Sequence, residues 1–509
     1  MYSIVSTAII QGIQSVPISV EADVSDGLPV FEMVGFLASE VQESKERVRT
    51  ALKNCGYALP PKHITINFTP ANIRKSGSGF DLPVAVAVLT ALGQMRQDLV
   101  GDFFVVGEIG LNGKVQPVKG ILPMVAEAKE RGLKKCMVPW ENAGEAALVS
   151  DMQVCAVKNL TDAVAVFNGN GEYFDAPYNI EEIQIKEASD FADVNGQTLV
   201  KRACETAVSG MHNLLLIGPP GAGKTMIAER IPGILPPLGV KECMELSKIY
   251  SVCGLLEHKK GLMRERPFRA PHHTVTAQGL AGGGAVPKPG EISLAHKGIL
   301  FLDELTEFQR ETLEILRQPL EEKKICITRL NASYEYPTDF MLVAAMNPCK
   351  CGYYPDMQKC TCTSQAIDRY LRKVSRPLLD RIDICVETPP VTFRELYHTG
   401  KSEKSKDIRE RVIRTHEIQK ERYKGEKFSF NSHIPSSKIF QYCELDEKQE
   451  IYMEQMYKKL DLTARTYHKI LRVARTLADM EESEKIKMRH LNEALCYRNI
   501  DKKYWEEKD

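Results

Sequence analysis

A loop of eight residues in the middle of the chain has the spacing of a phosphate-binding site. It follows an apolar run at 214–217 and precedes a helix-like stretch at 226–230, which is the strand–loop–helix setting of a G-x-x-x-x-G-K-[ST] motif. Its glycines let backbone N–H groups curl around an anion, and the helix N-terminus adds positive potential. A plain glycine-rich turn is the alternative, but every fixed position of the motif is filled. The loop consists of Gly218, Pro219, Pro220, Gly221, Ala222, Gly223, Lys224 and Thr225.

Two further apolar runs are predicted to be buried strands that complete an ATP-hydrolysing site. The run at 298–302 ends before Asp303 and Glu304, and the run at 340–345 leads to Asn347. Parallel strands of an open α/β sheet deliver the loops at their carboxyl ends to one crevice. We therefore expect these polar side chains to lie beside the phosphate loop.

These side chains predict hydrolysis of ATP with Mg²⁺ as cofactor, and each group has its own task. Lys224 should contact the β- and γ-phosphates, while Thr225 and Asp303 should hold the magnesium ion. Glu304 should polarise the attacking water, and Asn347 should help to orient that water.

The composition limits the classes of protein to which the chain can belong. Its 509 residues are 43% hydrophobic and 26% charged, and this length suggests about three domains. Lysine plus arginine and aspartate plus glutamate both number 67, so any contact with DNA must come from a local basic patch. No apolar run approaches a membrane span and the first residues lack a basic leader region, which favours a cytoplasmic protein.

Residues 1–170 are predicted to form an α/β domain, because strands with alternating apolar residues and helices with periodic apolar residues follow one another there. The segments 106–118, 126–132 and 138–142 resemble the proteolytic domain of Lon proteases. That resemblance implies a fold of the ribosomal-S5-domain-2 type.

The Lon-like domain is expected to lack peptidase chemistry. Lon proteases use a Ser–Lys dyad, whereas the matching positions here hold Gly79 and Leu122. A shifted dyad that pairs Ser76 or Ser78 with Lys119 is the alternative. It requires the lysine to lie within hydrogen-bond reach of the serine.

A basic segment lies between the phosphate loop and Asp303. Its positive and aromatic side chains would suit a contact with the backbone and bases of DNA. The alternative is an insertion whose arginines pair with acidic residues of a neighbouring subunit. The candidate DNA contacts are Lys259, Lys260, Arg264, Arg266, Phe268 and Arg269.

His272 and His273 follow this basic segment. A pair of histidines suggests a metal site, but adjacent side chains are expected to point apart. We therefore predict a structural role for both.

Four cysteines within fourteen residues form two C-x-C pairs, a pattern that can close a tetrahedral zinc site. The alternatives are a redox-active disulfide pair and cysteines without a shared role. We predict structural Zn²⁺. The expected ligands are Cys349, Cys351, Cys360 and Cys362.

Two arginines are candidates for catalysis across a subunit interface. Residues 378–383 resemble the L-x-R-F-D stretch of MCM helicases and magnesium chelatases, which implies that Arg381 is an arginine finger, with Arg376 as second candidate. The alternative for Arg381 is a surface salt bridge to Asp380 or Asp383.

Further on, residues 462–472 resemble a lid helix that begins with the sensor-2 arginine, which here is Arg465.

The Lon-like domain is predicted to be followed by an ATPase module. Residues 171–190 should be an acidic linker, 191–390 a P-loop AAA+ α/β core with a parallel sheet, and 391–509 a helical lid. This domain order, the motifs at 269–274 and 289–293 and the paired C-x-C motifs resemble the YifB/ComM family of magnesium-chelatase-like AAA+ ATPases.

The family resemblance implies a hexameric ring that binds DNA and promotes branch migration in natural transformation and recombination. Two other functions stay open, namely a metal-insertion ATPase of the magnesium-chelatase type and an ATP-dependent protease. The missing dyad argues against the protease. A chelatase motor normally works with porphyrin-binding and integrin-like subunits, and this sequence contains neither.

Overall fold

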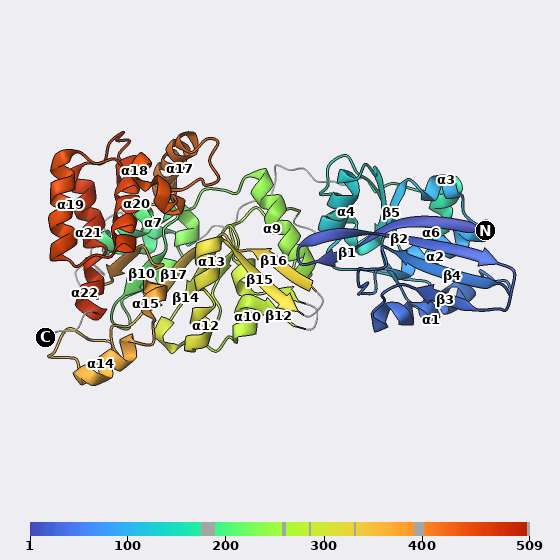
Figure 1. The fold of residues 1–509 in the computed structure, drawn as a ribbon, viewed down its shortest axis with the longest axis horizontal. Coiled ribbons are helices and arrows are strands. Elements are labelled where there is room, and N and C mark those ends of the chain that lie inside the picture. Colours follow the sequence, from blue (N-terminus) through green and yellow to red (C-terminus); the bar gives the residue numbers. More distant parts are fainter. Residues whose placement is uncertain (175–188, 257–260, 285–286, 330–331, 391–401, 506–509) are drawn as a thin grey trace. The chain divides into compact units, whose positions relative to one another are not determined.

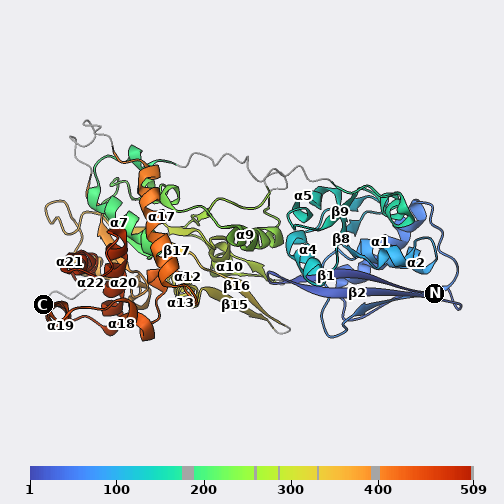
Figure 2. The same ribbon diagram turned by 90° about the horizontal axis from the view of Figure 1, so that it is seen from above.

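The computed structural model describes residues 1–174, 189–256, 261–284, 287–329, 332–390 and 402–505 (Figures 1 and 2). It divides into two compact units. The first comprises Met1–Gln184, Val240–Met263 and Leu330–Glu335, and the second comprises Ile185–Gly239, Arg264–Arg329 and Tyr336–Asp509. Among the described residues, no helix is both long enough and apolar enough to cross a membrane.

The first unit is built on a seven-stranded mixed sheet with the order β3-β4-β2-β1-β5-β8-β9. Its long hairpin pairs β1 with β2 from Tyr2↔Asp23 to Gln11↔Gln14, and β5, β8 and β9 run parallel to one another. The strands are β1 (Tyr2–Gln11), β2 (Gln14–Ser25), β3 (Phe31–Val34), β4 (His63–Thr69), β5 (Phe103–Val105), β8 (Lys135–Pro139) and β9 (Gln153–Val157). Alternating buried residues on β2 and β4 supply much of the core, as the sequence pattern predicts.

Helices cover this sheet. The helix α2 is apolar on all sides and buried along its whole length, because it packs on β1 and β2 and also contacts α1. The helices of the unit are α1 (Ser39–Asn54), α2 (Asp81–Ala91), α3 (Gln97–Val100), α4 (Ile121–Glu130), α5 (Ala143–Ala146), α6 (Leu160–Ala165) and α9 (Val240–Cys253). The α/β class predicted for this part of the chain is confirmed.

Apolar side chains surround the two positions that match the Lon dyad. A Cβ atom on Gly79 would lie 3.2 Å from Cγ2 of Val106 and 3.8 Å from Cγ1 of Val118, and Leu122 is fully buried. Nearby, the hydroxyl of Ser78 donates a hydrogen bond to the carboxylate of Glu108.

The aliphatic part of Lys119 lies against Gly254, where a Cβ atom would meet its Cε at 2.8 Å. The hydroxyl of Ser78 is hydrogen-bonded to Glu108. The described contacts therefore do not bring Ser78 and Lys119 together, as a shifted dyad would require.

The helix α9 belongs to the first unit although it follows the phosphate loop in the sequence. It packs on α4, where Gly120 N donates a hydrogen bond to Ser251 O (3.1 Å). The Ser251 hydroxyl donates to the buried carboxylate of Glu145, which also accepts the backbone N–H of Leu122 (2.9 Å). These bonds satisfy a carboxylate that is only 4% exposed, so α9 completes the core of this unit.

The second unit contains a five-stranded sheet in which all neighbours are parallel, with the order β11-β14-β17-β10-β18. Every residue of β10, β14 and β17 is buried, as a strand covered on both faces requires. The strands of this sheet are β11 (Phe268–Arg269), β14 (Ile299–Leu302), β17 (Met341–Met346), β10 (Leu214–Ile217) and β18 (Ile384–Glu387). Between β14 and β17 in the sequence come β15 (Lys324–Arg329) and β16 (Ala332–Pro337), and β16 begins in the first unit. The predicted parallel α/β core is confirmed.

Helices form most of the second unit outside this sheet, and its carboxyl-terminal part is helical as predicted. Figure 2 shows α7, α17 and α20 close together, and these three helices contact one another. Their core holds the carboxylate of Asp479, which is 1% exposed and bonds Arg422 (2.5 and 2.7 Å) and Asn431 (2.8 Å). The longer helices are α7 (Thr198–Gly210), α14 (Ser364–Leu371), α17 (Ser405–Arg422), α19 (Glu447–Lys459), α20 (Ala464–Met480), α21 (Met488–Cys496) and α22 (Asn499–Trp505), and the short ones used below are α8 (Lys224–Ala228), α12 (Arg310–Glu314), α13 (Arg317–Glu322) and α15 (Arg376–Leu379).

Candidate functional site

The loops after neighbouring strands meet at the carboxyl edge of the parallel sheet. Lys224 is the first residue of α8, the helix that follows β10 in the sequence. Its Nζ donates hydrogen bonds to the carbonyl oxygens of Gly218 (2.8 Å) and Pro219 (2.9 Å). The same amine donates to Oδ1 of Asn347 (3.0 Å), which follows β17. One ammonium group thus joins the phosphate loop to the end of the adjacent strand.

Thr225 and Asp303 make a second connection across this edge. The Thr225 hydroxyl donates a hydrogen bond to Oδ2 of Asp303 (2.6 Å), which follows β14. The backbone N–H of Glu304 donates to the other oxygen of Asp303 (2.9 Å). Hydroxyl and carboxylate oxygens are ligands that Mg²⁺ prefers, so this pair fits a magnesium ion that accompanies a nucleotide.

The backbone of the phosphate loop requires glycine. Gly221 and Gly223 have φ angles of +76° and +80°, in the left-handed region that side chains disfavour. At Gly218, a Cβ atom would lie 2.2 Å from the carbonyl oxygen of Thr388. The loop can therefore turn closely around a phosphate only with these residue types.

The charge balance of the site favours an anion at Lys224. Burial lowers the pKa of Lys224, and the nearby charges of Asp303 and Glu304 act in the opposite direction. A phosphate group beside the buried amine would stabilise its ammonium form further.

Glu304 follows β14 with a φ of +51°, an uncommon conformation for a glutamate that often marks a functional position. Its Oε2 lies 3.4 Å from Nδ1 of His273, and the ring of His273 lies against that of His272 with centroids 4.0 Å apart and planes tilted by 35°. The prediction that the two histidines point apart is wrong. Sequence reasoning also missed His273 as a neighbour of Glu304, because that contact depends on the pairing of β11 with β14.

Arg381 lies at the opposite, amino edge of the sheet, three residues before β18. Its side chain is 9% exposed and is held by α13, since Nη2 lies 2.7 Å from Oε1 of Glu321 and Nε donates to the carbonyl of Arg317 (3.1 Å). The Arg381 carbonyl accepts a hydrogen bond from the side chain of Asn213 (2.7 Å), the residue before β10. The phosphate loop begins after β10, so the length of that strand, roughly 10 Å, separates it from this edge.

Arg465 lies near Arg381 rather than near the phosphate loop of the same chain. It is the second residue of α20, its side chain is 65% exposed, and Nη2 lies 3.6 Å from the same Oε1 of Glu321. One turn later, Lys469 donates a hydrogen bond to the carbonyl of Ile382 (3.0 Å) and fixes α20 to this edge. Arg376, the second candidate for the finger, is exposed at the start of α15.

The basic segment is only partly available for DNA. Arg266 donates hydrogen bonds to the carbonyls of Pro236 (2.7 Å) and Lys297 (2.6 Å). Phe268 belongs to β11 and stacks on Phe301 at 5.7 Å, and Arg269 forms a bidentate ion pair with Glu291 (2.7 and 2.8 Å). Arg264 is half-buried, while Lys259 and Lys260, like most of the expected acidic linker, lie outside the described residues.

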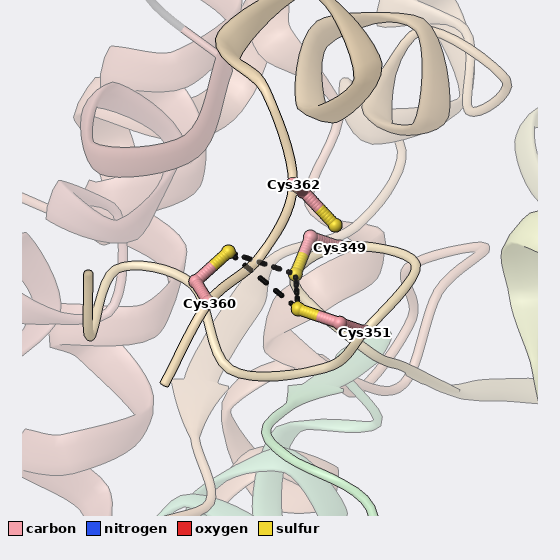
Figure 3. A group of neighbouring side chains, drawn as sticks. All are labelled: Cys349, Cys351, Cys360 and Cys362. Carbon is pink, nitrogen blue, oxygen red and sulfur yellow. Dashed lines mark hydrogen bonds between the residues drawn. The ribbon is translucent and has the colours of Figure 1, made fainter. Parts of the chain in front are cut away.

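The four cysteines of the C-x-C pairs gather at one point, and Figure 3 shows their sulfur atoms together. The Sγ atoms of Cys349, Cys351 and Cys360 are separated by 3.3, 3.5 and 3.8 Å, and all four sulfur atoms lie within 4.8 Å of one another. Backbone N–H groups of Gly352 (3.3 Å) and Tyr354 (3.4 Å) donate to the sulfur of Cys349. The cluster can hold a metal ion.

Proton affinities in the cluster differ among its members. Burial would raise the pKa of Cys351, but hydrogen bonds from the backbone of Tyr353 and Thr361 and from neighbouring thiols lower it to about 6. Burial raises the pKa of Cys360 to about 12, and hydrogen bonding with Cys351 adds to this rise. Four sulfur atoms so close together can all be thiolates only when a cation compensates their charge.

The cysteine cluster packs on the phosphate loop. A Cβ atom on Gly352, which has a φ of +88°, would lie 2.3 Å from Cδ of Pro220. On its other side, Tyr354 contacts the ring of Tyr504 in α22 at a centroid distance of 5.9 Å. The cluster thus fixes the chain segment that follows Asn347 against both the loop and the last helix.

Comparisons with known proteins match nearly the whole chain. Family models described as "Magnesium chelatase, subunit ChlI", "Subunit ChlI of Mg-chelatase" and "Magnesium chelatase, subunit ChlI C-terminal" match residues 190–396, 20–142 and 402–498. The chain is 40% identical over 494 residues to competence protein ComM of Haemophilus influenzae, covering 96% of this chain and 95% of that protein. It is 40% identical over 503 residues to the uncharacterized protein YifB of Escherichia coli, covering 98% and 97%. A shorter match to Lon protease 2 of Bacillus subtilis is 30% identical over 145 residues, 28% of this chain and 26% of that protein.

The geometry of the site predicts separate effects for two substitutions. Lys224→Ala should abolish ATP binding, because the phosphate charge then lacks its buried counter-charge. Glu304→Gln should bind ATP normally but lower the hydrolysis rate on the order of 10²-fold or more, because the amide is a much weaker proton acceptor. Nucleotide binding and steady-state phosphate release measure the two effects. Glu311→Gln, on the exposed start of α12, is the matched control and should leave both unchanged; normal turnover by Glu304→Gln would remove Glu304 from the mechanism.

Proposed function

Because the chain belongs to the magnesium-chelatase-like family that includes ComM and YifB, we propose that this AAA+ ATPase is a DNA motor that works as a hexameric ring in the cytoplasm and promotes branch migration. The observation that carries the proposal is the position of its charged groups along the parallel sheet. Phosphate-binding residues lie at the carboxyl edge, whereas Arg381 and Arg465 converge on Glu321 at the amino edge. An ATP site completed by such arginines requires a second copy of the chain.

Hydrolysis follows from the groups at the carboxyl edge. Lys224 binds the phosphates, and Asn347, which is bonded to the Lys224 amine, helps to orient the attacking water. Glu304 takes the proton of that water as it attacks. Mg²⁺ held by Thr225 and Asp303 would neutralise part of the charge on the phosphates. An arginine from the neighbouring subunit stabilises the charge that develops in the transition state.

DNA is the proposed partner, and its contact is the amino-terminal part of the basic segment. The side chains of Arg266, Phe268 and Arg269 are engaged by contacts within the chain, so we assign the contact to Lys259, Lys260 and Arg264. The relative ComM is named as a competence protein, which supports a role in the handling of DNA during transformation.

Two other functions remain as alternatives. A metal-insertion ATPase of the chelatase type shares the ATP site, and the family models that match the chain carry that name. An ATP-dependent protease is disfavoured because Gly79 and Leu122 fill the dyad positions of the Lon-like domain. We propose that this domain acts as an assembly or DNA-guiding collar on the ring.

We also propose that the cysteine cluster holds one structural Zn²⁺ ion. Four thiolate ligands form the closed tetrahedral site that Zn²⁺ favours, and such a site has no open position for chemistry. The ion would hold the segment after Asn347 in place against the phosphate loop.

Removal of the zinc ligands tests this assignment. Elemental analysis of protein purified without a metal-binding tag should give about one zinc per chain, and the double variant Cys349→Ser, Cys362→Ser should contain little. The variant should also melt at a lower temperature, because metal binding contributes to folding. Cys496→Ser, an exposed cysteine on α21, is the control that should keep the zinc. Wild-type protein without zinc and with all four thiols open to alkylation would contradict the proposal.

The DNA contact can be tested by charge removal. The triple variant Lys259→Ala, Lys260→Ala, Arg264→Ala should keep its basal ATPase but lose stimulation by single-stranded or branched DNA and migration of a synthetic four-way junction. Its DNA affinity should also depend less on salt. The slope of the logarithm of the binding constant against the logarithm of the salt concentration should become shallower by up to about three, because up to three phosphate contacts are lost. The variant Lys448→Ala, Lys458→Ala, Lys459→Ala removes equal charge from exposed positions on α19 and should behave as wild type. Wild-type protein that neither binds DNA nor responds to it would favour the chelatase alternative.

Catalysis across the interface can be tested by mixing subunits. Arg381→Ala should lower the hydrolysis rate by about 10³-fold while ATP still binds, because the transition-state charge loses its partner. Mixing it with Lys224→Ala subunits should restore part of the rate, since some sites then combine the intact lysine of an Arg381→Ala subunit with the intact arginine of a Lys224→Ala neighbour. Arg376→Ala tested in the same way distinguishes the two candidate fingers, and Arg414→Ala on α17 is an exposed control. A monomeric wild type that hydrolyses ATP, with no recovery in any mixture, would exclude an arginine in trans.

A further inference from the structure

Glu304 needs a partner that directs its carboxylate. Its side chain is 60% exposed, so packing leaves several rotamers open to it. A general base acts only when it lies within hydrogen-bond reach of the proton that it removes. A base of this kind is usually oriented by a third group.

His273 is in the place where such a group is needed. It follows β11 by four residues, and β11 pairs in parallel with β14, the strand that precedes Glu304. The loops after these two strands therefore meet at the same edge of the sheet. There, Nδ1 of His273 lies 3.4 Å from Oε2 of Glu304.

The position of His273 is itself determined by its neighbours. Its ring lies against that of His272 with centroids 4.0 Å apart, and it makes a T-shaped contact with the ring of Phe308, which is 4% exposed, at a centroid distance of 6.4 Å. His272 is held in turn, because its Nδ1 accepts the backbone N–H of Thr274 (3.4 Å) and lies 2.9 Å from the Thr274 hydroxyl. A fixed imidazole can direct a flexible carboxylate.

We propose that His273 is a positioning residue for ATP hydrolysis, which holds one oxygen of Glu304 and so directs the other toward the attacking water. A carboxylate has about four lone-pair sites, so a hydrogen bond from His273 at Oε2 would leave Oε1 able to accept the proton. This inference rests on the proposed role of Glu304 as general base. His273 itself contacts neither nucleotide nor water in this scheme.

The test is a set of single and double variants assayed for Mg²⁺-dependent ATP hydrolysis without DNA. His273→Ala should lower kcat by about 10-fold to 10²-fold and leave the KM for ATP nearly unchanged, because the base is misdirected while the phosphate loop is intact. His273→Asn should recover most of the rate, because the amide nitrogen can donate from about the position of Nδ1. In the Glu304→Gln background, His273→Ala should have no further effect, since it acts through the carboxylate that is already gone.

A matched control exists in the first unit of the chain. His63 Nε2 lies 3.8 Å from Oε2 of Glu32, and the two side chains are 38% and 57% exposed, compared with 32% and 60% for His273 and Glu304. His63→Ala should leave kcat and KM unchanged. A fall in kcat in that variant would mean that loss of any such pair disturbs the protein, and it would overturn the specific role of His273.

The remaining outcomes separate this inference from the proposed function. An equal loss of rate on His273→Ala in the wild-type and Glu304→Gln backgrounds would mark the histidine as merely structural. A higher rate in His273→Ala would show that the contact restrains the base, and an unchanged rate would show that it does nothing; both overturn the inference while the ATPase stands. A wild type without hydrolysis would instead overturn the proposed function and this inference with it. A Glu304→Gln variant with full turnover would remove the general base on which this inference rests, while the ATPase stands.

Discussion

The parallel pairing of β10, β17 and β14 is the constraint on which the candidate site depends. The register Leu214↔Val343 and Leu300↔Leu342 aligns the carboxyl ends of the three strands, so that the residues after them meet. Hydrogen bonds then close the site, because Lys224 bonds Asn347 and Thr225 bonds Asp303. A shift in one strand would separate the nucleotide-binding loop from the groups that act on the nucleotide.

The apolar strands explain how much of this core could be predicted from the sequence. The run 214–217 is β10 residue for residue, and the runs 298–302 and 340–345 differ from β14 and β17 by one residue at the ends. Strands buried on both faces must be apolar throughout, and such runs are visible in a sequence. Polar residues directly after the runs then indicated which side chains would meet at the edge of the sheet.

The features that could not be predicted depend on contacts between distant segments. β11 has two residues in a basic stretch, and it exists because Phe268 pairs with Ile299 and stacks on Phe301. The helix α9 follows the phosphate loop in the sequence, yet its Ser251 satisfies Glu145 in the first unit. No local pattern encodes either contact, and the same is true of His273 beside Glu304.

The contacts of Glu321 with two arginines in a single chain bear on how the proposed ring assembles. In one chain its carboxylate, with backbone carbonyls, holds the guanidinium of Arg381 and also attracts Arg465. A neighbour's ATP would present more negative charge than one carboxylate, and charge-assisted bonds between arginine and phosphate are among the strongest in proteins. In the proposed ring, transfer of an arginine from Glu321 to that phosphate would therefore become favourable only when the neighbouring site is occupied. Such an exchange would keep the arginines oriented in the free chain and link subunit contact to the presence of ATP.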